Sequence, residues 1–441
     1  MPCRRSIRQG ARKSACWMPC CWRRRDKEKV MLKRLHVTNF KSLADMTIEL
    51  PHFTVLFGPN AAGKSNFLDA VQALSRIGTL RTLSDAMSEP IRGYPIEFFS
   101  FPPGGLQDLL NSKSPKFSLE ADLTVGSSSY RYRVEVAIEP DSGGLSVKDE
   151  YLAQLGARGE PKGRPSIERV ADSLHIRRKS KPAHPRQETV GLNHSILSDQ
   201  RLGGVEYRAI ERARQELSGW RTYYLDPRVA MRAAQPPSDV QDIGVLGGEI
   251  APYLYRLRAD YPKHFQAVSR TLKSLVPNVE RMDVDLDKRR GTLDILVRQD
   301  GIDYSSRIVS EGTLRVLALC AIAVNPWGSS LLTFEEPENG VHPRRLELIA
   351  DLLLSLAVDG NRQVIVTTHS PLFCDAVLRR ARSYPTQIGL FNVRRRGHAT
   401  VVRSFDVSGP LFRDLEIAQA LTAGTEDGLF ENLLLRGVLD E

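Results

Sequence analysis

A glycine-containing segment near the start of the chain could bind a phosphate group. Gly58-Pro-Asn-Ala-Ala-Gly63-Lys64-Ser65 combines two glycines with a lysine and a hydroxyl. Glycine allows backbone conformations in which successive N–H groups point toward one phosphate. The lysine would neutralise the outer phosphates of a nucleotide, and the serine hydroxyl would bind Mg²⁺. The segment therefore predicts a phosphate site made by Gly58, Pro59, Asn60, Ala61, Ala62, Gly63, Lys64, Ser65 and Asn66.

Two adjacent carboxylates follow an apolar segment much later in the chain. Residues 330–334 are typical of a buried strand, and Glu335 and Glu336 come directly after them. Apolar strands seldom end in two acids, and the carboxyl ends of parallel strands lie at the nucleotide in α/β proteins. We expect Glu335 to hold Mg²⁺ through its water shell and Glu336 to polarise the attacking water as a general base.

A histidine occupies the same position after the next apolar segment. His369 follows residues 363–368, which again have the pattern of a buried strand. A lone histidine is more often structural, but one at this strand end could contact the γ-phosphate and the attacking water. Its order after the two carboxylates favours the catalytic interpretation.

A serine and a glycine precede the apolar helix predicted over residues 314–324. Ser310 and Gly312 could form an anion-binding cap at the start of that helix. Serine is also a routine N-cap, so this short pattern carries information mainly through its position between the glycine loop and the carboxylates.

The intervening pattern predicts the elements that position these residues. A short apolar run predicts a strand over 53–57 before the glycine loop, and an amphipathic pattern predicts a helix directly after it. Residues 117–125 and 130–138 alternate as a hairpin, while 205–220 and 250–275 have helical spacing. No heptad pattern persists, which argues against a long coiled coil. The expected fold class is α/β, with a mixed sheet, an antiparallel side sheet and a short inserted helical arm.

Taken together, these motifs resemble those of the RecF/SMC-like ABC-type ATPases. The resemblance is closest to the bacterial AAA-family ATPases of the OLD-like and AbiEii-like group. Two features depart from the usual ABC pattern: Glu335 stands where an aspartate is common, and no Q-loop glutamine is evident, although Gln107 lies in the right region. The matching segments are Gly58–Ser65 with Walker A, Ser310–Thr313 with the signature motif, Leu331–Glu336 with Walker B, Glu338–Pro343 with the D-loop and His369 with the switch histidine.

The resemblance implies that the α/β fold is a P-loop ABC-type ATPase head and that the protein is an ATP-driven switch. Two copies would dimerise head to head around two ATP molecules with Mg²⁺, each ATP lying between Walker A of one copy and Ser310 and Gly312 of the other. Hydrolysis would separate the heads, in DNA maintenance, DNA repair or phage defence in the cytoplasm, together with an effector protein encoded nearby. The choice of ATP over GTP rests on the resemblance. The alternatives are a P-loop phosphotransferase acting on a small acceptor and a non-hydrolysing nucleotide-binding scaffold.

The resemblance also suggests a division of the chain. After residue 405 the chain is too short for the TOPRIM nuclease domain of OLD-like relatives, so we expect nuclease or toxin activity to come from another protein. The expected units are a basic, cysteine-containing extension (1–30), an N-lobe (31–185), an inserted helical arm (186–275), a C-lobe (276–405) and a helical tail (406–441).

Charge and hydropathy limit the partners. The net charge of +10 is concentrated in residues 1–30, which leaves 52 basic against 50 acidic residues in the remainder. The extension is expected to be disordered or an upstream translated segment, with metal binding or targeting left open. Residues 156–187 hold nine Lys or Arg against three acids and have two interpretations, a solvated loop or a DNA-facing strip. No apolar run is long enough to cross a membrane, and Cys320 and Cys374 are expected to be inert core residues.

Overall fold

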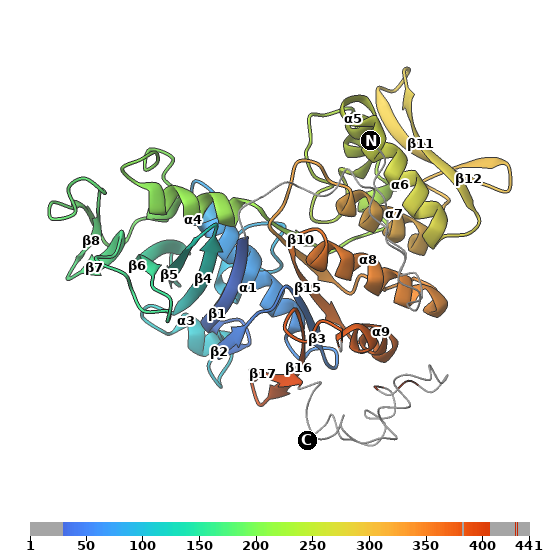
Figure 1. Cartoon of the computed structure of the whole chain (residues 1–441). Helices are drawn as coiled ribbons and strands as arrows, with labels where there is room; N and C mark the ends of the chain where they lie inside the picture. Colours follow the sequence, from blue (N-terminus) through green and yellow to red (C-terminus); the bar gives the residue numbers. More distant parts are fainter. Residues whose placement is uncertain (1–29, 382, 406–427, 429, 431–441) are drawn as a thin grey trace, which may run out of the picture.

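The computed structural model describes residues 30–381, 383–405, 428 and 430, which are organised around three β-sheets (Figure 1). The predicted N-terminal extension, except Val30, and the predicted helical tail, except Gly428 and Phe430, lie outside these residues.

A mixed sheet of six strands forms the centre of the molecule, as the sequence predicts. Its order is β10-β14-β15-β3-β16-β17. The first five strands are parallel and β17 is antiparallel to β16. The strands are β3 (Phe53–Phe57), β10 (Trp220–Tyr223), β14 (Leu331–Glu335), β15 (Gln363–Thr368), β16 (Ile388–Arg396) and β17 (Ala399–Phe405).

The predicted antiparallel side sheet has eight strands in the order β2-β1-β4-β5-β6-β7-β8-β9. The predicted hairpin is β4 paired with β5, with Leu123 opposite Tyr130. The strands are β1 (Val30–Phe40), β2 (Leu43–Glu49), β4 (Lys116–Val125), β5 (Ser128–Glu139), β6 (Gly144–Leu155), β7 (Ile167–Val170), β8 (Ser173–Ile176) and β9 (Arg186–Thr189).

Helices cover both faces of the central sheet because successive side chains of each strand alternate between them. In β15, Val364 and Val366 belong to one buried cluster with residues of the helices α7 and α8, whereas Ile365 belongs to another with residues of α1 and the side sheet. Gln363 joins the two sheets, since its buried amide donates to Leu32 O at 2.8 Å and accepts from Leu32 N at 2.8 Å. The strands that carry the motifs are therefore held on both faces.

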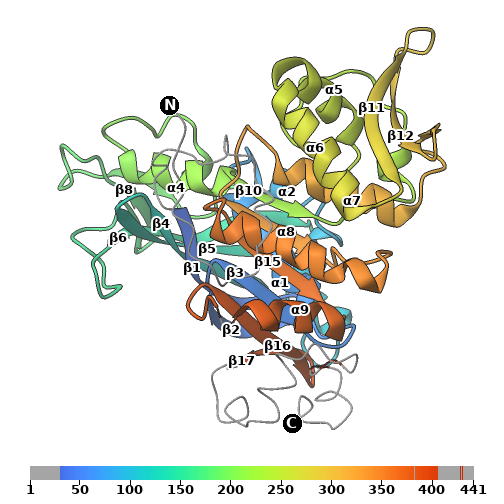
Figure 2. The ribbon, with the colours of Figure 1, turned by 45° about the vertical axis from the view of Figure 1, so that its right-hand side comes forward.

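A third sheet and two helices lie at one end of the molecule (Figure 2), and their buried residues share one hydrophobic cluster with strands of the central sheet. The sheet consists of β11 (Val279–Asp287), β12 (Thr292–Gln299) and β13 (Ile302–Ser305), and α5 and α6 lie against it. The range 186–275, predicted as an inserted arm, contains the predicted helices but also β10, a strand of the central sheet. The α-helices are α1 (Lys64–Ile77), α2 (Leu83–Ala86), α3 (Leu106–Leu110), α4 (Arg208–Ser218), α5 (Ile250–Asp260), α6 (Pro262–Leu275), α7 (Glu311–Ala323), α8 (Leu346–Val358) and α9 (Pro371–Ala381), and the short 3₁₀ helices are η2 (Pro95–Phe98), η3 (Ile196–Ser198), η4 (Ala230–Arg232) and η5 (Pro343–Arg345).

Candidate nucleotide site

Three neighbouring parallel strands bring the motifs to one edge of the central sheet. Glu335 lies opposite Thr367, and Thr368 lies opposite Phe57. The ends of β14, β15 and β3 are therefore level with one another. Because these are the carboxyl ends of parallel strands, the glycine loop, the two carboxylates and His369 leave the sheet on the same side.

The glycine loop connects β3 to α1 and requires both of its glycines. Gly58 has φ 150° and Gly63 has φ 101°, values that side chains rarely adopt. A Cβ on Gly58 would lie 2.1 Å from Val393 O, and one on Gly63 would lie 2.0 Å from Thr400 Oγ1. The loop therefore packs closely against β16 and β17. Ala61, within the loop, also has a positive φ of 62°. This conformation leaves the start of α1 free to receive an anion.

Lys64 lies along this loop. Its Nζ donates to Gly58 O at 2.7 Å and to Pro59 O at 2.9 Å. Burial lowers the pKa of Lys64, while the nearby carboxylates of Glu336, Glu338 and Glu335 act in the opposite direction. The ammonium group of Lys64 is therefore close both to the glycine loop and to the carboxylates that follow β14. Its positive charge would attract a phosphate bound at the loop.

The two residues expected to hold Mg²⁺ are in direct contact. The Ser65 hydroxyl donates a hydrogen bond to Glu335 Oε1, although 270 positions separate the residues. A hydroxyl and a carboxylate oxygen side by side are the donor types that Mg²⁺ prefers, with waters and phosphate oxygens as the other ligands. Ser65 and Glu335 therefore fit the metal. In the described residues, no group of three or more His, Cys, Asp or Glu side chains forms a metal site made of protein ligands alone.

Glu336 and His369 form a second pair beside the first. His369 Nδ1 lies 2.8 Å from Glu336 Oε1, and Asn339 Nδ2 donates to Glu336 Oε2 at 2.8 Å. Glu336 itself has φ 44°, an uncommon value for a residue with a side chain, and its N–H is held by Thr367 O at 2.9 Å. Both oxygens of the carboxylate are thus oriented by neighbours, as a general base requires.

Glu338, two positions after Glu336, carries another carboxyl group of this region. Glu338 is buried, and burial raises its pKa to about 7. Thr368 donates a hydrogen bond to Glu338 Oε1, and Oε2 has no hydrogen-bond partner in the described residues. The bond ties the segment after β14 to the end of β15, so it supports the positions of both Glu336 and His369.

Ser310 caps helix α7, as the sequence predicts. Its hydroxyl accepts from Thr313 N at 3.2 Å and lies 2.8 Å from Thr313 Oγ1. In the part of the chain that the structure describes, this hydroxyl hydrogen-bonds only within its own helix and not to the Gly58–Ser65 loop.

Gly312 has a structural role that sequence reasoning did not anticipate. A Cβ at this position would lie 2.3 Å from Gly340 O. The first turn of α7 therefore packs against the segment that follows Glu338, and only a glycine fits at this contact. The predicted signature and D-loop segments are therefore in direct contact within a single chain.

Arg92 is the main residue of the site that sequence reasoning missed. It lies in the loop after α2, where no local pattern marks it, yet its Nη1 is 3.1 Å from Glu335 Oε1. Its Nη2 is 3.4 Å from the buried Asp69, which also accepts from Lys41 Nζ at 2.7 Å and from the Tyr224 hydroxyl at 2.7 Å. By contrast Gln107, the residue in the region of the expected Q-loop, is exposed on α3.

A cavity of about 560 Å³ opens beside the glycine loop. Its wall includes Ser42 and Asn66, whose side chains are hydrogen-bonded at 2.7 Å, together with Arg92. Phe99 and Phe101 supply aromatic surface on the same wall. The volume lies within the range of small-molecule sites, although Asn66 is the only residue of the predicted phosphate site in its wall.

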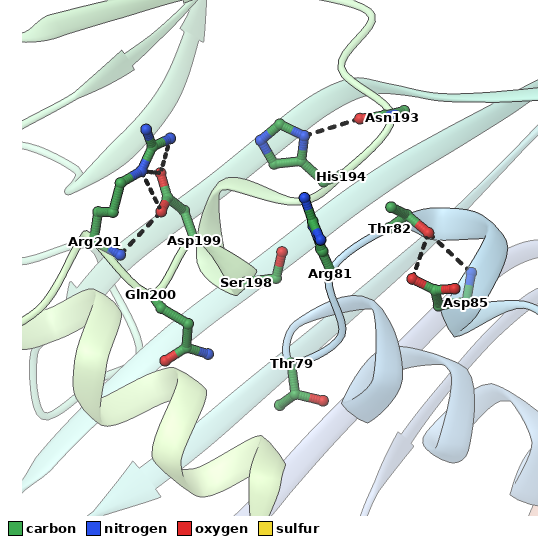
Figure 3. Close-up of a pocket in the computed structure, with 10 residues that line it drawn as sticks. All are labelled: Thr79, Arg81, Thr82, Asp85, Asn193, His194, Ser198, Asp199, Gln200 and Arg201. Atoms are coloured by element: carbon green, nitrogen blue, oxygen red, sulfur yellow. Dashed lines mark hydrogen bonds and ion pairs between the residues drawn. The ribbon is translucent and has the colours of Figure 1, made fainter.

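A second hollow, of about 980 Å³, lies between the end of α1 and the segment before α4 (Figure 3). Its charged groups are largely used within the protein: Arg201 pairs with Asp199 at 2.9 Å, and Asp85 accepts from the Thr82 hydroxyl at 2.7 Å. We assign no chemistry to it.

The order of β14, β15 and β3 places a phosphate-binding loop beside a pair of carboxylates, which is the arrangement of a P-loop nucleotide-binding domain. The chain belongs to the family described as "AAA domain, putative AbiEii toxin, Type IV TA system", whose model matches residues 53–375. The matched range contains every residue of the candidate site from Gly58 to His369. The resemblance inferred from the motifs is therefore confirmed, and the chain is a member of an ATPase family with a nucleotide-binding fold.

Several solved structures are similar to this chain. One is the SMC head bound to the C-winged helix domain of ScpA, with 15% identity, a TM-score of 0.49, and coverage of 86% of this chain and 98% of that one. The SMC head domain from Thermotoga maritima has 16% identity, a TM-score of 0.39, and coverage of 85% and 98%. The Pyrococcus furiosus SMC head with an extended coiled coil, bound to the C-terminal domain of ScpA, has 13% identity, a TM-score of 0.45, and coverage of 89% and 100%. All three TM-scores are below 0.5.

None of the curated proteins matches the chain significantly. Among the described helices, none has both the length and the apolar character needed to cross a membrane.

Proposed function

We propose that this protein binds and hydrolyses ATP, and that two copies close head to head around two ATP molecules. The observation that carries the proposal is the pairing of Glu336 with His369 next to the contact between Ser65 and Glu335. These pairs give a site for a water nucleophile and a site for a metal, side by side at the phosphate loop. A protein that only bound a nucleotide would need the metal site but not the site for the attacking water.

The residues divide the work of hydrolysis among them. Lys64 and the N–H groups at the start of α1 would hold the β- and γ-phosphates. Glu336 would accept a proton from the attacking water, and His369, which contacts Glu336 through Nδ1, would orient that carboxylate and contact the γ-phosphate through its other ring nitrogen. Bound at Ser65 and Glu335, Mg²⁺ would supply charge neutralisation for the phosphates.

Dimerisation follows from the position of the Ser310 cap. Its hydroxyl is engaged only within α7 of the described chain, at the start of a helix whose positive end favours an anion. The γ-phosphate of an ATP held by a second copy would be a suitable partner for Ser310 and Gly312. Loss of that phosphate would remove the bridging contact, so binding would close the heads and hydrolysis would open them.

We further propose that the switch acts in the cytoplasm, in DNA maintenance or phage defence, through an effector encoded nearby. The family description supports a defence role, since it names a putative toxin of a toxin–antitoxin system. DNA remains open as a partner.

The direct test of the activity is phosphate release by the wild-type chain and by Lys64→Ala. Because Lys64 is the positive charge at the phosphate loop, we expect the variant to lose nucleotide binding and turnover together. Lys288→Ala is a suitable control, since Lys288 is an exposed lysine in the turn between β11 and β12. Normal ATP affinity of Lys64→Ala would refute the assignment of the loop.

The two alternatives make different predictions. A phosphotransferase would release phosphate slowly and transfer it to a small acceptor, with no requirement for Ser310. A non-hydrolysing scaffold would keep its full function after Glu336→Gln.

A further inference from the structure

A hollow of about 480 Å³ lies far along the side sheet from the candidate nucleotide site. Three segments that are distant in sequence form its wall: the turn between β4 and β5, the region from Arg164 to Lys179 that contains β7 and β8, and the start of α4. Part of the basic stretch noted in the sequence is therefore folded into one side of a concave surface.

The lining of this hollow is strongly cationic. Glu206 is its one carboxylate among the described residues. Six lining residues carry a positive charge: Arg164, Arg177, Arg178, Lys179, Arg208 and Arg212. Such a concentration of like charge is unfavourable unless anions balance it.

Two of these six side chains have polar contacts of their own, and Glu206 lies close enough to Arg178 and Lys179 for their charges to lower its pKa, after the larger effect of hydrogen bonds from Ser180. Arg177 pairs with Glu168, and Arg212 donates to Ser128 Oγ at 3.4 Å. Within the described ranges, the exposed side chains of Arg164, Arg178, Lys179 and Arg208 form no ion pair.

Other arginines of the same sheet are different. Arg131 pairs with Asp122 at 2.7 Å, and Arg133 pairs with Asp149 at 2.7 Å. Because the sheet neutralises its arginines elsewhere, the unpaired cations at the hollow are a local feature and not a general property of this surface.

The start of helix α4 adds a second attraction for anions. Tyr207 is the N-cap residue and makes no side-chain hydrogen bond to the helix, so the first N–H groups of this 11-residue helix are not capped. Tyr207 and Arg208 both line the hollow, together with the hydroxyl residues Ser128 and Ser166. Backbone N–H groups, hydroxyls, guanidinium groups and ammonium groups all bind phosphate in proteins.

We propose that this hollow binds a compact ligand that carries two or more phosphate groups, at a site separate from the Gly58–Ser65 loop. The volume lies within the range of small-molecule sites and is sufficient for a ligand of nucleotide size. An extended nucleic acid would instead favour cations spread along a track. Here Arg178, Lys179 and Arg208 converge on one concavity, while Lys181 of the same basic stretch is not part of its wall.

The test is binding of inorganic tripolyphosphate, measured by calorimetry on the full chain. Lys64→Ala is included in every protein, so that the glycine loop does not contribute. We expect Arg178→Glu with Arg208→Glu to weaken tripolyphosphate binding by about tenfold or more, since charge-assisted contacts to phosphate are lost. Lys288→Glu with Arg289→Glu makes the same change of charge at exposed residues of the turn between β11 and β12, and should change the affinity by less than about twofold.

Several results would overturn the proposal: no binding of tripolyphosphate, or an equal loss in both double variants, which would indicate a non-specific effect of net charge. The third contrary result concerns a 30-nucleotide single strand. If it binds through Arg178 and Arg208 and tripolyphosphate does not displace it, the hollow is part of a nucleic-acid surface. Thermal unfolding checks the fold of each variant. If the glutamate pair is destabilised, Arg178→Gln with Arg208→Gln, compared with Lys288→Gln and Arg289→Gln, gives the same comparison with a smaller charge change.

Discussion

His369 Nδ1 lies 2.8 Å from Glu336 Oε1, and this contact joins the ends of two neighbouring strands of the central sheet. The residues that directly follow β14 and β15 are thus held together. Asn339 holds the other carboxylate oxygen at 2.8 Å, so Glu336 is oriented from both sides. A carboxylate oriented in this way is suited to position a small reactant, such as water, beside it.

The first prediction concerns His369. His369→Ala should lower kcat for ATP by about 10²-fold or more, because a positioned proton donor and hydrogen-bonding partner is lost. ATP binding should change little, since Lys64 and the loop N–H groups remain. Steady-state kinetics and equilibrium nucleotide binding separate the two effects.

His36 provides a matched control for this prediction. It forms another His–carboxylate contact, with Asp45 at 3.0 Å, on the side sheet away from the loop. His36→Ala should leave kcat within about twofold of wild type, as expected for a surface pair. A normal kcat in His369→Ala would remove the histidine from the mechanism.

The second prediction concerns Gly312. A Cβ there would lie 2.3 Å from Gly340 O, a backbone atom that can move only with its whole segment. Gly312→Ala should therefore lower the free energy of unfolding by about 1–3 kcal/mol, as overpacking does, and reduce ATP turnover. At Gly248 an added Cβ would be 3.7 Å from its nearest neighbour, so Gly248→Ala should have little effect. Chemical denaturation of both variants measures the difference, and equal stability would contradict the close contact.

The third prediction concerns pH and the buried Glu216. Burial raises its pKa to about 7, despite the hydrogen bond that Trp220 donates at 2.8 Å. The unfolded chain releases this proton near the ordinary carboxyl pKa, so between that value and pH 7 the folded state binds more protons. Stability attributable to Glu216 therefore falls as the pH rises through this window.

Glu216→Gln removes this titration. Relative to wild type, the variant should gain about 2 kcal/mol between pH 5.5 and pH 8.5. Denaturation of both proteins at the two pH values measures the change. A stability difference that does not vary with pH would show that Glu216 titrates normally.

Most of the fold could be predicted because its patterns are local. The segments around 53–57, 331–335 and 363–368 are short apolar strands followed by polar residues with distinctive chemistry, so both the strands and their functional ends could be identified. The hairpin of β4 and β5 alternates clearly on both sides of its turn. Such patterns reflect burial on one or both faces of a sheet, which the sequence records directly.

The missed features depend on contacts between distant segments. Arg92 and Asp69 are joined to Glu335 only through the folded chain, and nothing near Arg92 distinguishes it from other loop arginines. Gly312 looks like a residue of a phosphate cap, and its contact with Gly340 becomes visible only in three dimensions. The membership of β10 in the central sheet has the same origin, since a four-residue strand has too little pattern to reveal its partner.

The most direct test of the ATP-driven dimer is sedimentation of Glu336→Gln with and without ATP and Mg²⁺. This change removes the general base but keeps the shape of the side chain and the phosphate contacts, so hydrolysis should stop with ATP still bound. We predict a monomer without ATP and a dimer with it. The same chain carrying Ser310→Arg should bind ATP yet remain a monomer, because the substitution blocks the cap that meets the partner's γ-phosphate. A Glu336→Gln protein that stays monomeric with saturating ATP, or a Ser310→Arg form that dimerises as well as its parent, would contradict the account.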